Sequence, residues 1–292
     1  MTDDTRLVPA GQQVERLATG ATWSEGPLWM PEERAVRWSD IPGDRILRWD
    51  AATGVVSVHR EEVEFTNGRA LDRDGTVVQC SHGRRRLERE AADGTLSILV
   101  SHWGDRRLNS PNDVAVAPDG SYWFTDPDYG IRQAHEGHPG EREYGDCRVF
   151  RWSEDDGLVP VIEDIVRPNG IAFSPDGGTV YVTDTAAGLG DGPGRWIRAY
   201  DVVGAGARNG RHFATMEVGL PDGIAVDEDG RVWSSAGDGV HVYDPDGVEC
   251  HFVPVPEVVA NLCFGGDDGT DLFIAATTSL YRIRTATRAA GW

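Results

Sequence analysis

Six polar side chains occupy one register of a repeated pattern in this sequence. Each lies seven residues before the acidic residue of an acid–glycine turn, or of a degenerate copy of that turn. They are Glu25, Asn67, Asn112, Asn169, Asp222 and Asn261. Four of the six asparagines of the chain are among them, at a position that an ordinary strand would fill with an apolar residue. Carboxylate and carboxamide oxygens bind hard cations, so the pattern predicts one divalent metal, Ca2+ in first place and Zn2+, Mn2+ or Mg2+ as alternatives.

An alternative interpretation needs no metal: the six polar side chains would only form hydrogen bonds with buried backbone groups. We favour the metal because two of the six residues, Glu25 and Asp222, are acids. Burying two carboxylates with no cation between them is energetically costly.

The repeat that carries these residues consists of a turn followed by strand-like segments. The turns are DRDG at 72–75, APDG at 117–120, SPDG at 174–177, DEDG at 227–230 and GDDG at 266–269, with PEER at 31–34 as the degenerate copy. Runs rich in Val, Tyr, Trp and Phe follow them, for example SYWFTD and TVYVTD. Six such units, spaced roughly as propeller blades are, predict an all-β fold. We expect a six-bladed β-propeller with four antiparallel strands per blade, forming a single domain over residues 1–292.

The sixth unit lacks a fourth strand, because the chain ends shortly after LYRIRT. The N-terminal segment QQVERLA can supply this strand, so the ring is predicted to close by pairing of the N-terminal strand within the last blade. In a propeller the innermost strands run along the central axis, and equivalent residues of successive blades converge on one channel. The six polar residues should therefore face a common point.

At these residues the sequence resembles the gluconolactonase family, which includes regucalcin and the luciferin-regenerating enzyme. The most specific stretch is NSPNDVAVAPDGSYWFTDPDYG at 109–130, which is similar to the bacterial gluconolactonase branch. Further matching stretches are SEGPLW, TNGRALDRDG, RPNGIAFSPDG and PDGIAVDEDG. The resemblance implies a carboxylic-ester hydrolase that opens a sugar lactone.

The resemblance also implies roles for individual residues. Glu25, Asn112, Asn169 and Asp222 would ligate the metal, and Asp222 would also be the catalytic acid/base. His82, Ser110 and Tyr129 are expected substrate contacts, and a position in a surface loop is the alternative for His82 and Tyr129. Asn67 and Asn261 would lie behind the metal ligands or face the substrate. Ser110 marks a departure, because regucalcin-like members carry an arginine at this position.

The resulting hypothesis is a metal-polarised lactone carbonyl attacked by water that Asp222 activates. Two alternatives remain open: a phosphotriesterase of the diisopropyl fluorophosphatase type, and a non-catalytic propeller that binds a ligand. A serine esterase is disfavoured because the chain has no G-x-S-x-G motif.

Composition narrows the set of partners. The net charge is −20 and all 28 cationic residues are arginine, which disfavours nucleic acid and membrane partners and excludes lysine chemistry. The N-terminus has neither a basic start nor an apolar stretch, which predicts a cytoplasmic location. A monomer is the default expectation, with a small-molecule lactone as the substrate.

Two segments suggest ligand sites only superficially. The insertion at 126–146 is long enough to overhang one end of the channel and contains HEGH at 135–138, but glycines oppose the helix that a zinc motif needs. We interpret HEGH as a solvated loop tip. GLGDGPG at 188–194 lacks the lysine of a phosphate loop and is predicted to be a linker between strands.

Overall fold

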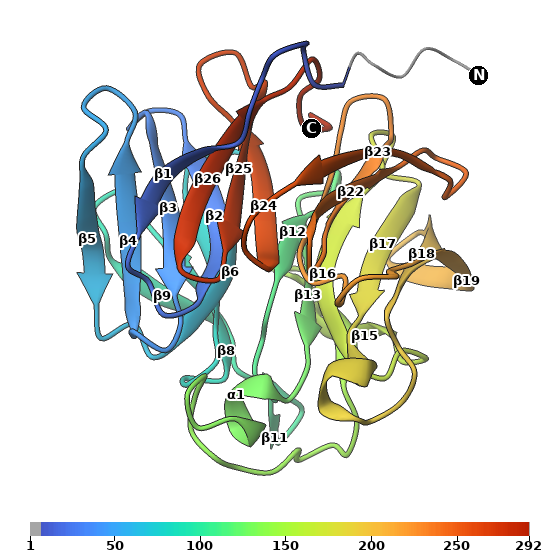
Figure 1. Cartoon of the computed structure of the whole chain (residues 1–292). Coiled ribbons are helices and arrows are strands. Elements are labelled where there is room, and N and C mark those ends of the chain that lie inside the picture. The colour runs from blue at the N-terminus through green and yellow to red at the C-terminus, as the bar shows by residue number, and fades with distance from the viewer. Residues whose placement is uncertain (1–6, 292) are drawn as a thin grey trace.

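Six four-stranded antiparallel sheets surround a central axis (Figure 1). The computed structural model describes residues 7–291, so residues 1–6 and 292 of the predicted domain lie outside the described residues. The strands of blades 1 to 3 are β2 (Ser24–Met30), β3 (Ala35–Asp40), β4 (Arg45–Asp50) and β5 (Val56–Glu61); β6 (Thr66–Leu71), β7 (Val77–Ser81), β8 (Arg86–Glu90) and β9 (Leu96–Val100); and β12 (Val114–Val116), β13 (Tyr122–Asp126), β14 (Arg148–Ser153) and β15 (Gly157–Ile162). Those of blades 4 to 6 are β16 (Pro168–Phe173), β17 (Thr179–Asp184), β18 (Trp196–Val203) and β19 (Gly206–Thr215); β20 (Ile224–Val226), β21 (Val232–Ser235), β22 (Gly239–Tyr243) and β23 (Glu249–Pro254); and β24 (Val259–Gly265), β25 (Asp271–Ala276), β26 (Ser279–Arg284) and β1 (Glu15–Thr19). The predicted six-bladed β-propeller is confirmed.

Closure of the ring follows the prediction as well. β1 lies antiparallel to β26, with Glu15 opposite Arg282 and Thr19 opposite Ser279. The first strand of the chain is therefore the outermost strand of the last blade. This pairing joins the two ends of the chain through one sheet and leaves no open gap between the first and last blades.

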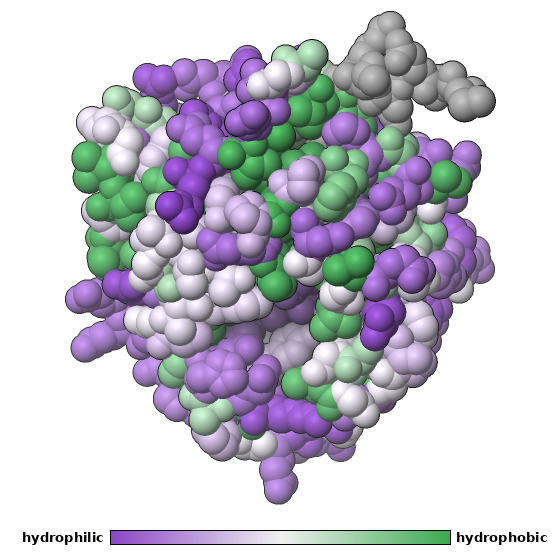
Figure 2. Space-filling view, in the orientation of Figure 1, coloured by the Kyte–Doolittle hydropathy of each residue, from purple (hydrophilic) through white to green (hydrophobic). Residues whose placement is uncertain are grey.

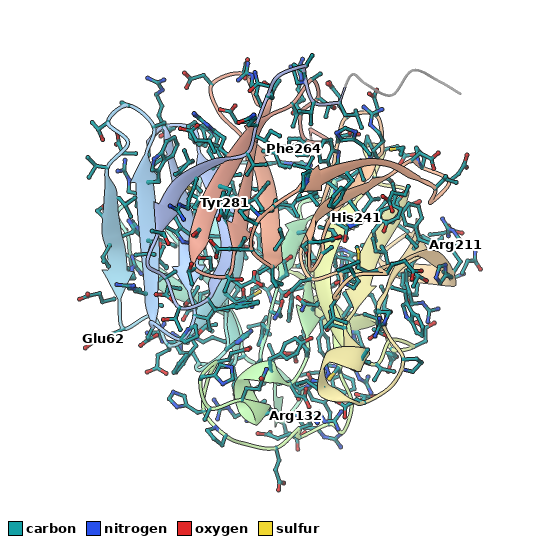
Figure 3. The ribbon with its side chains drawn as sticks, viewed as in Figure 1. Glu62, Arg132, Arg211, His241, Phe264 and Tyr281 are labelled. Atoms are coloured by element: carbon teal, nitrogen blue, oxygen red, sulfur yellow. The ribbon has the colours of Figure 1, made fainter. Side chains whose placement is uncertain are left out.

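The hydrophobic core is divided into clusters that lie between neighbouring blades. Between blades 5 and 6, Trp233 meets Phe264 edge to face at 5.5 Å between ring centroids, and Tyr281 belongs to the same cluster. Figure 3 shows Phe264 and Tyr281 within blade 6. The interface of blades 1 and 2 is polar by contrast, with Arg37 paired to Glu90 at 3.0 Å.

Loops at one end of the propeller carry the short helical elements. α1 (Tyr129–Arg132) follows β13, and the 3-10 turn η1 (Ala186–Leu189) follows β17. A two-stranded hairpin, β10 (His102–Trp103) with β11 (Arg106–Arg107), precedes blade 3. Figure 1 places α1 at the end of the blades opposite the last residues of the chain. Among the described residues, no helix is both long enough and apolar enough to cross a membrane.

Candidate active site

A cavity of about 170 Å3 lies on the propeller axis at the end that carries α1. The surface is hollowed between the blades and the α1 loop (Figure 2). Five of the six residues of the predicted register line this cavity, together with the predicted substrate residue Tyr129. The five are Glu25, Asn67, Asn112, Asn169 and Asp222. The blade repeat therefore brings together residues that are far apart in the chain.

The sixth register residue, Asn261, lies one level deeper on the axis. Its side chain hydrogen-bonds to the carboxyl groups of Glu25 and Asp113, and its Oδ1 accepts from the backbone amide of Leu262 at 2.7 Å. It lines a second cavity, on the opposite side of the axial ring. Asn261 is thus placed to hold Glu25 rather than to face the first cavity.

Glycines directly after the register residues allow the innermost strands to approach one another. A Cβ at Gly170 would lie 2.3 Å from the carbonyl oxygen of Asp222, and one at Gly26 would lie 2.5 Å from that of Asn67. Gly26 also has a φ of +47°. A larger residue at either position would force neighbouring blades apart and widen the ring of polar groups.

Hydroxyl side chains at the ends of second strands brace the site residues of the next blade. Ser39 Oγ donates to the carbonyl of Asn67 at 2.9 Å, Thr125 Oγ1 to that of Asn169 at 2.6 Å, and Thr183 Oγ1 to that of Asp222 at 2.8 Å. These bonds cross from blades 1, 3 and 4 to blades 2, 4 and 5. Each brace fixes the backbone that carries a cavity-lining side chain.

The aspartate that follows each of these hydroxyl residues holds the loop before the site residue of its own blade. Asp40 Oδ1 accepts from the amide of Thr22 at 2.8 Å, and Asp126 accepts from the amides of Asn109 and Ser110 at 2.8 and 2.9 Å. Asp184 accepts from the amide of Arg167 at 3.3 Å. The loops held in this way lead to Glu25, Asn112 and Asn169. The repeated pairs SD, TD and TD at 39–40, 125–126 and 183–184 were a sequence signal for this support.

Removing one of these hydroxyl braces should destabilise the site without changing the volume that its side chains fill. Thr183→Val keeps the shape of the side chain but deletes the bonds to the Asp222 carbonyl and to the Gly170 amide, which are 2.8 and 2.7 Å long. We expect the free energy of unfolding to fall by about 0.5–1.5 kcal/mol, because two hydrogen bonds are lost while the Gly170 amide still donates to the Asp222 carbonyl at 3.1 Å. Thr179→Val, in the same strand, is the matched control. Equal denaturation midpoints for the two variants would contradict the brace.

The electrostatics of the cavity are dominated by uncompensated carboxyl groups. Burial, followed by the nearby charge of Asp113, raises the pKa of Glu25 to about 8. Burial and then the charge of Glu25 raise the pKa of Asp222 well above its usual range. No arginine or histidine is among the described residues that line the cavity. A bound cation would supply the missing positive charge.

His82 orients two of the cavity asparagines from behind. It is fully buried, and burial lowers the pKa of its imidazole to about 4. Nδ1 lies 3.1 Å from the carbonyl oxygen of Glu136, which can only accept, so Nδ1 carries the proton. Nε2 is then an acceptor for the amide nitrogens of Asn67 and Asn112, at 3.3 and 3.5 Å. Both carboxamides consequently turn their oxygens away from His82.

Ser110 and Tyr129, the two other predicted substrate residues of this region, have different positions. Ser110 is fully buried and holds the α1 loop, since its Oγ donates to Pro127 O at 2.7 Å and accepts from Gly130 N at 3.0 Å. Neither Ser110 nor His82 lines the cavity. Tyr129 does line it, and its hydroxyl accepts from Asn169 Nδ2 at 3.4 Å while also bonding to Thr185.

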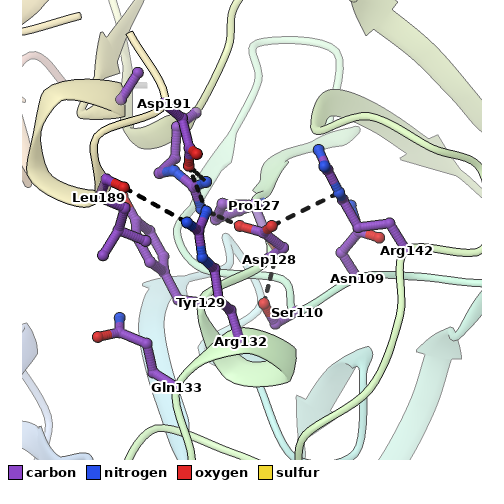
Figure 4. Close-up of polar contacts among 12 residues, drawn as sticks. Asn109, Ser110, Pro127, Asp128, Tyr129, Arg132, Gln133, Arg142, Leu189 and Asp191 are labelled. Atoms are coloured by element: carbon purple, nitrogen blue, oxygen red, sulfur yellow. Dashed lines mark hydrogen bonds and ion pairs between the residues drawn. The ribbon is translucent and has the colours of Figure 1, made fainter.

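Ion pairs fasten the α1 loop to the η1 loop beside the cavity (Figure 4). Arg132 pairs with Asp191 and reaches the carbonyl of Leu189, and Arg142 lies 3.7 Å from Asp128. The buried Arg167 pairs with both Asp128 and Asp191. Figure 3 shows Arg132 at this end of the molecule. The 188–194 segment is a linker between β17 and β18, as predicted, and its first two residues also line the cavity.

Several cavity residues had no signal in the sequence. Trp23, Ile41, Leu189 and Leu220 give the cavity apolar surface, and Glu136 of the 126–146 insertion adds a third carboxylate. They lie in loops outside the repeated register, so spacing could not identify them. The prediction that HEGH is a solvated loop tip is right for its two histidines, whose side chains are 64% and 61% exposed. It is wrong for Glu136, which lines the cavity because the loop folds back onto α1.

The donor set fits a hard cation. Two carboxylates and the oxygens of up to three carboxamides face one space, and Asn67 Oδ1 is buried without a hydrogen-bond partner among the described residues. The described residues contain no cluster of three or more His, Cys, Asp or Glu arranged to hold a metal. A cation at this place would therefore need the carboxamide oxygens as well as Glu25 and Asp222.

Comparison with known proteins gives a consistent result. Residues 23–278 match the family model described as the SMP-30/gluconolactonase/LRE-like region. A gluconolactonase from Zymomonas mobilis is 32% identical, over 96% of this chain and 83% of its own length. The chain also resembles solved structures. A gluconolactonase from Xanthomonas campestris has a TM-score of 0.90 and 38% identity, covering 96% of this chain and 91% of that one.

A regucalcin from Agrobacterium tumefaciens, described as a calcium-binding protein, shares the fold with a TM-score of 0.78. It is 21% identical and covers 95% of this chain and 96% of that one. The relatives named as gluconolactonases confirm the predicted enzyme class, carboxylic-ester hydrolase, because a lactone is a cyclic ester. The match over residues 23–278 and the 32% identity confirm the resemblance seen in the sequence. The chain belongs to the SMP-30/gluconolactonase/LRE-like family.

Proposed function

We propose that this protein hydrolyses a sugar lactone in the axial cavity, with one divalent cation, Ca2+ in first place, held by Glu25, Asn112, Asn169 and Asp222. The observation that carries the proposal is the pairing of two buried carboxyl groups with carboxamide oxygens, in a cavity whose described lining includes no cationic side chain. The gluconolactonase names among the relatives support the lactone as substrate. The regucalcin with the same fold agrees with a calcium-type site.

The residues of the chain divide the chemistry between them. A cation held by Glu25, Asn112, Asn169 and Asp222 would supply positive charge to polarise the lactone carbonyl. Asp222 accepts a proton from the attacking water and returns it to the ring oxygen as the C–O bond breaks. Asn169, hydrogen-bonded to the Asp222 carboxylate and to the hydroxyl of Tyr129, holds Asp222 in position. The apolar side chains of Trp23 and Leu220 line another part of the cavity wall.

The direct test is alkali consumption during turnover of glucono-1,5-lactone, with metal content measured by elemental analysis. We expect turnover that a chelator abolishes and that added Ca2+, Mn2+, Mg2+ or Zn2+ restores. Fluoride release from a fluorophosphate, without lactone turnover, would favour a phosphotriesterase instead. If protein that contains metal shows neither activity over a broad panel of substrates, the result would favour a propeller that binds a ligand without catalysis.

Metal affinity is expected to rise with pH. Because the pKa of Glu25 is about 8 in the metal-free fold, this group holds a proton at pH 7 that a cation must displace. The dissociation constant for Ca2+ should therefore fall up to about tenfold per pH unit between pH 6 and 8. Calorimetry at three pH values, in two buffers of different ionisation enthalpy, measures both the affinity and the protons released. An affinity independent of pH would contradict the raised pKa.

The same shift has a consequence for stability. The folded-state pKa of Glu25 lies above the unfolded value of 4.5, so the folded chain binds the extra proton. This contribution to the stability of the metal-free protein is present below pH 4.5 and is lost as the pH rises toward 8. Bound cation reverses the preference, because it favours the ionised carboxylate.

A further inference from the structure

Glu136 is the only residue of HEGH whose side chain enters the cavity. Its carboxyl group lines the cavity with Glu25 and Asp222 and is 19% exposed, whereas the flanking histidines point to solvent. Oε1 accepts from Gln133 Nε2 at 3.1 Å. Oε2 has no hydrogen-bond donor among the described residues and lies 4.0 Å from the nearest ring nitrogen of His82. One oxygen of this carboxylate is therefore available to a ligand.

Tight packing of the insertion fixes this position. A Cβ at Gly137 would lie 2.1 Å from the carbonyl oxygen of Gly130, and a Cβ at Gly130 would lie 2.6 Å from the Cβ of His82. Two glycines thus let the loop fold back onto α1 and the buried imidazole. The bond from His82 Nδ1 to the Glu136 carbonyl, 3.1 Å long, ties the backbone at the same place. Glu136 is held on an ordered wall of the cavity and is not a free loop tip.

The charged side chains that line the cavity determine which net charge a bound substrate can carry. The cavity carries three carboxyl groups, and the described residues that line it include no arginine or histidine. Arg132 of the α1 loop is paired with Asp191, and Arg167, which directly precedes β16, is paired with Asp128 and Asp191. One divalent cation balances Glu25 and Asp222 and leaves the Glu136 carboxyl group without a partner charge. Burial raises the pKa of Glu136 to about 7, so above that pH the group is an unpaired negative charge in the cavity.

We propose that Glu136 is a substrate-binding residue that selects uncharged polyhydroxylated lactones over anionic ones. Its free oxygen accepts a hydrogen bond from a hydroxyl group of the sugar, and its charge repels a phosphate, sulfonate or carboxylate on the substrate. This inference rests on the proposed lactone hydrolysis and assigns the specificity of the same site.

The experiment compares glucono-1,5-lactone with its 6-phosphate in the metal-loaded enzyme at pH 8, above the pKa of about 7 to which burial raises the Glu136 carboxyl group. Glu136→Gln keeps the shape of the side chain and removes the charge. We expect KM for the neutral lactone to rise about 3- to 10-fold, since a charge-assisted hydrogen bond becomes a neutral one. We expect the ratio of kcat/KM for the neutral over the phosphorylated lactone to fall at least about tenfold.

Glu141→Gln is the matched control, because it removes the same charge from an exposed position of the same insertion. This variant should have the same KM and kcat/KM as wild type for both substrates. A ratio unaltered in Glu136→Gln, or altered equally in Glu141→Gln, would overturn the assignment. If Glu136→Gln does not fold, the wild-type enzyme still tests the idea: discrimination against the phosphorylated lactone should weaken from 0.05 to 0.5 M salt, and salt-independent discrimination would overturn it.

A binding measurement separates this inference from the proposed function. Calorimetry with 1,5-anhydroglucitol and its 6-phosphate requires no turnover. Absence of lactone hydrolysis by wild-type protein would refute the proposed function, and the binding pair would still test Glu136. Preference for the neutral ring in wild-type protein, reduced at least about tenfold in Glu136→Gln, supports the role of Glu136. If wild type and Glu136→Gln prefer the neutral ring over its 6-phosphate to the same extent, the role of Glu136 is overturned.

Discussion

Replacement of Asp222 by asparagine is expected to lower kcat for lactone hydrolysis by about 10^3-fold or more. A general base contributes about 10^2- to 10^4-fold to such a reaction, and asparagine cannot accept the proton. The side chain lines the cavity, and its backbone is held by Thr183 and by the bond from its own amide to Ser235 Oγ at 2.8 Å. The variant should therefore keep its shape, and its loss of activity should report chemistry.

Two controls make this result specific. Asp246→Asn, in an exposed turn of the same blade, should have wild-type activity. Metal content of Asp222→Asn must be measured, because the substitution also weakens the metal site. Activity within tenfold of wild type at saturating metal would show that another group accepts the proton.

The second large effect is expected for Glu25→Gln, which should weaken metal binding by about 100-fold. A carboxylate about 4 Å from a divalent cation gains roughly 8 kcal/mol at an effective dielectric constant of 20, and most of this gain is offset by the cost of removing water from the two ions. Part of the remaining loss in the variant is also offset, because glutamine has no proton to release, whereas Glu25, with a pKa of about 8, must release one at pH 7. The affinity is read by calorimetric titration with Ca2+.

Glu25→Gln should also have a signature that a damaged fold would not produce. Above pH 8 the metal-free variant should be more stable than metal-free wild type, since it no longer buries a carboxylate that lacks a cation. Glu154→Gln, at an exposed position, is the control for a change of charge alone. A variant that binds metal as tightly as wild type would remove Glu25 from the ligand set.

Much of this molecule was predictable because a propeller is a repeat. Five acid–glycine turns and one degenerate copy indicated six blades. A single register within them indicated five residues that line the cavity, together with Asn261. Closure of the ring by β1 followed from the sixth unit, which lacks a fourth strand of its own. These inferences needed only local spacing, since every blade repeats the same short-range geometry.

Other features were decided by contacts between segments that share no register. Asn261 resembles the other asparagines in sequence, yet it lies below the ring, where it bonds to Glu25 and Asp113. His82 is buried behind two asparagines, and Ser110 holds the α1 loop. Position along a repeat predicts the blade and the strand of a residue, but the direction of its side chain depends on the groups packed against it.

The blades, the closure of the ring and the composition of the axial ring could be read from the amino-acid sequence, because they follow from periodic turns and strands. The entry of Glu136 into the cavity, and the positions of Leu189 and Trp23 in its wall, depend on how the chain packs. Those residues come from irregular loops, whose path is set by long-range packing such as the contact of Gly137 with Gly130. Long-range packing of that kind leaves no period in the sequence, so the repeat predicted the axial ring of polar residues but not the loop residues that complete the cavity.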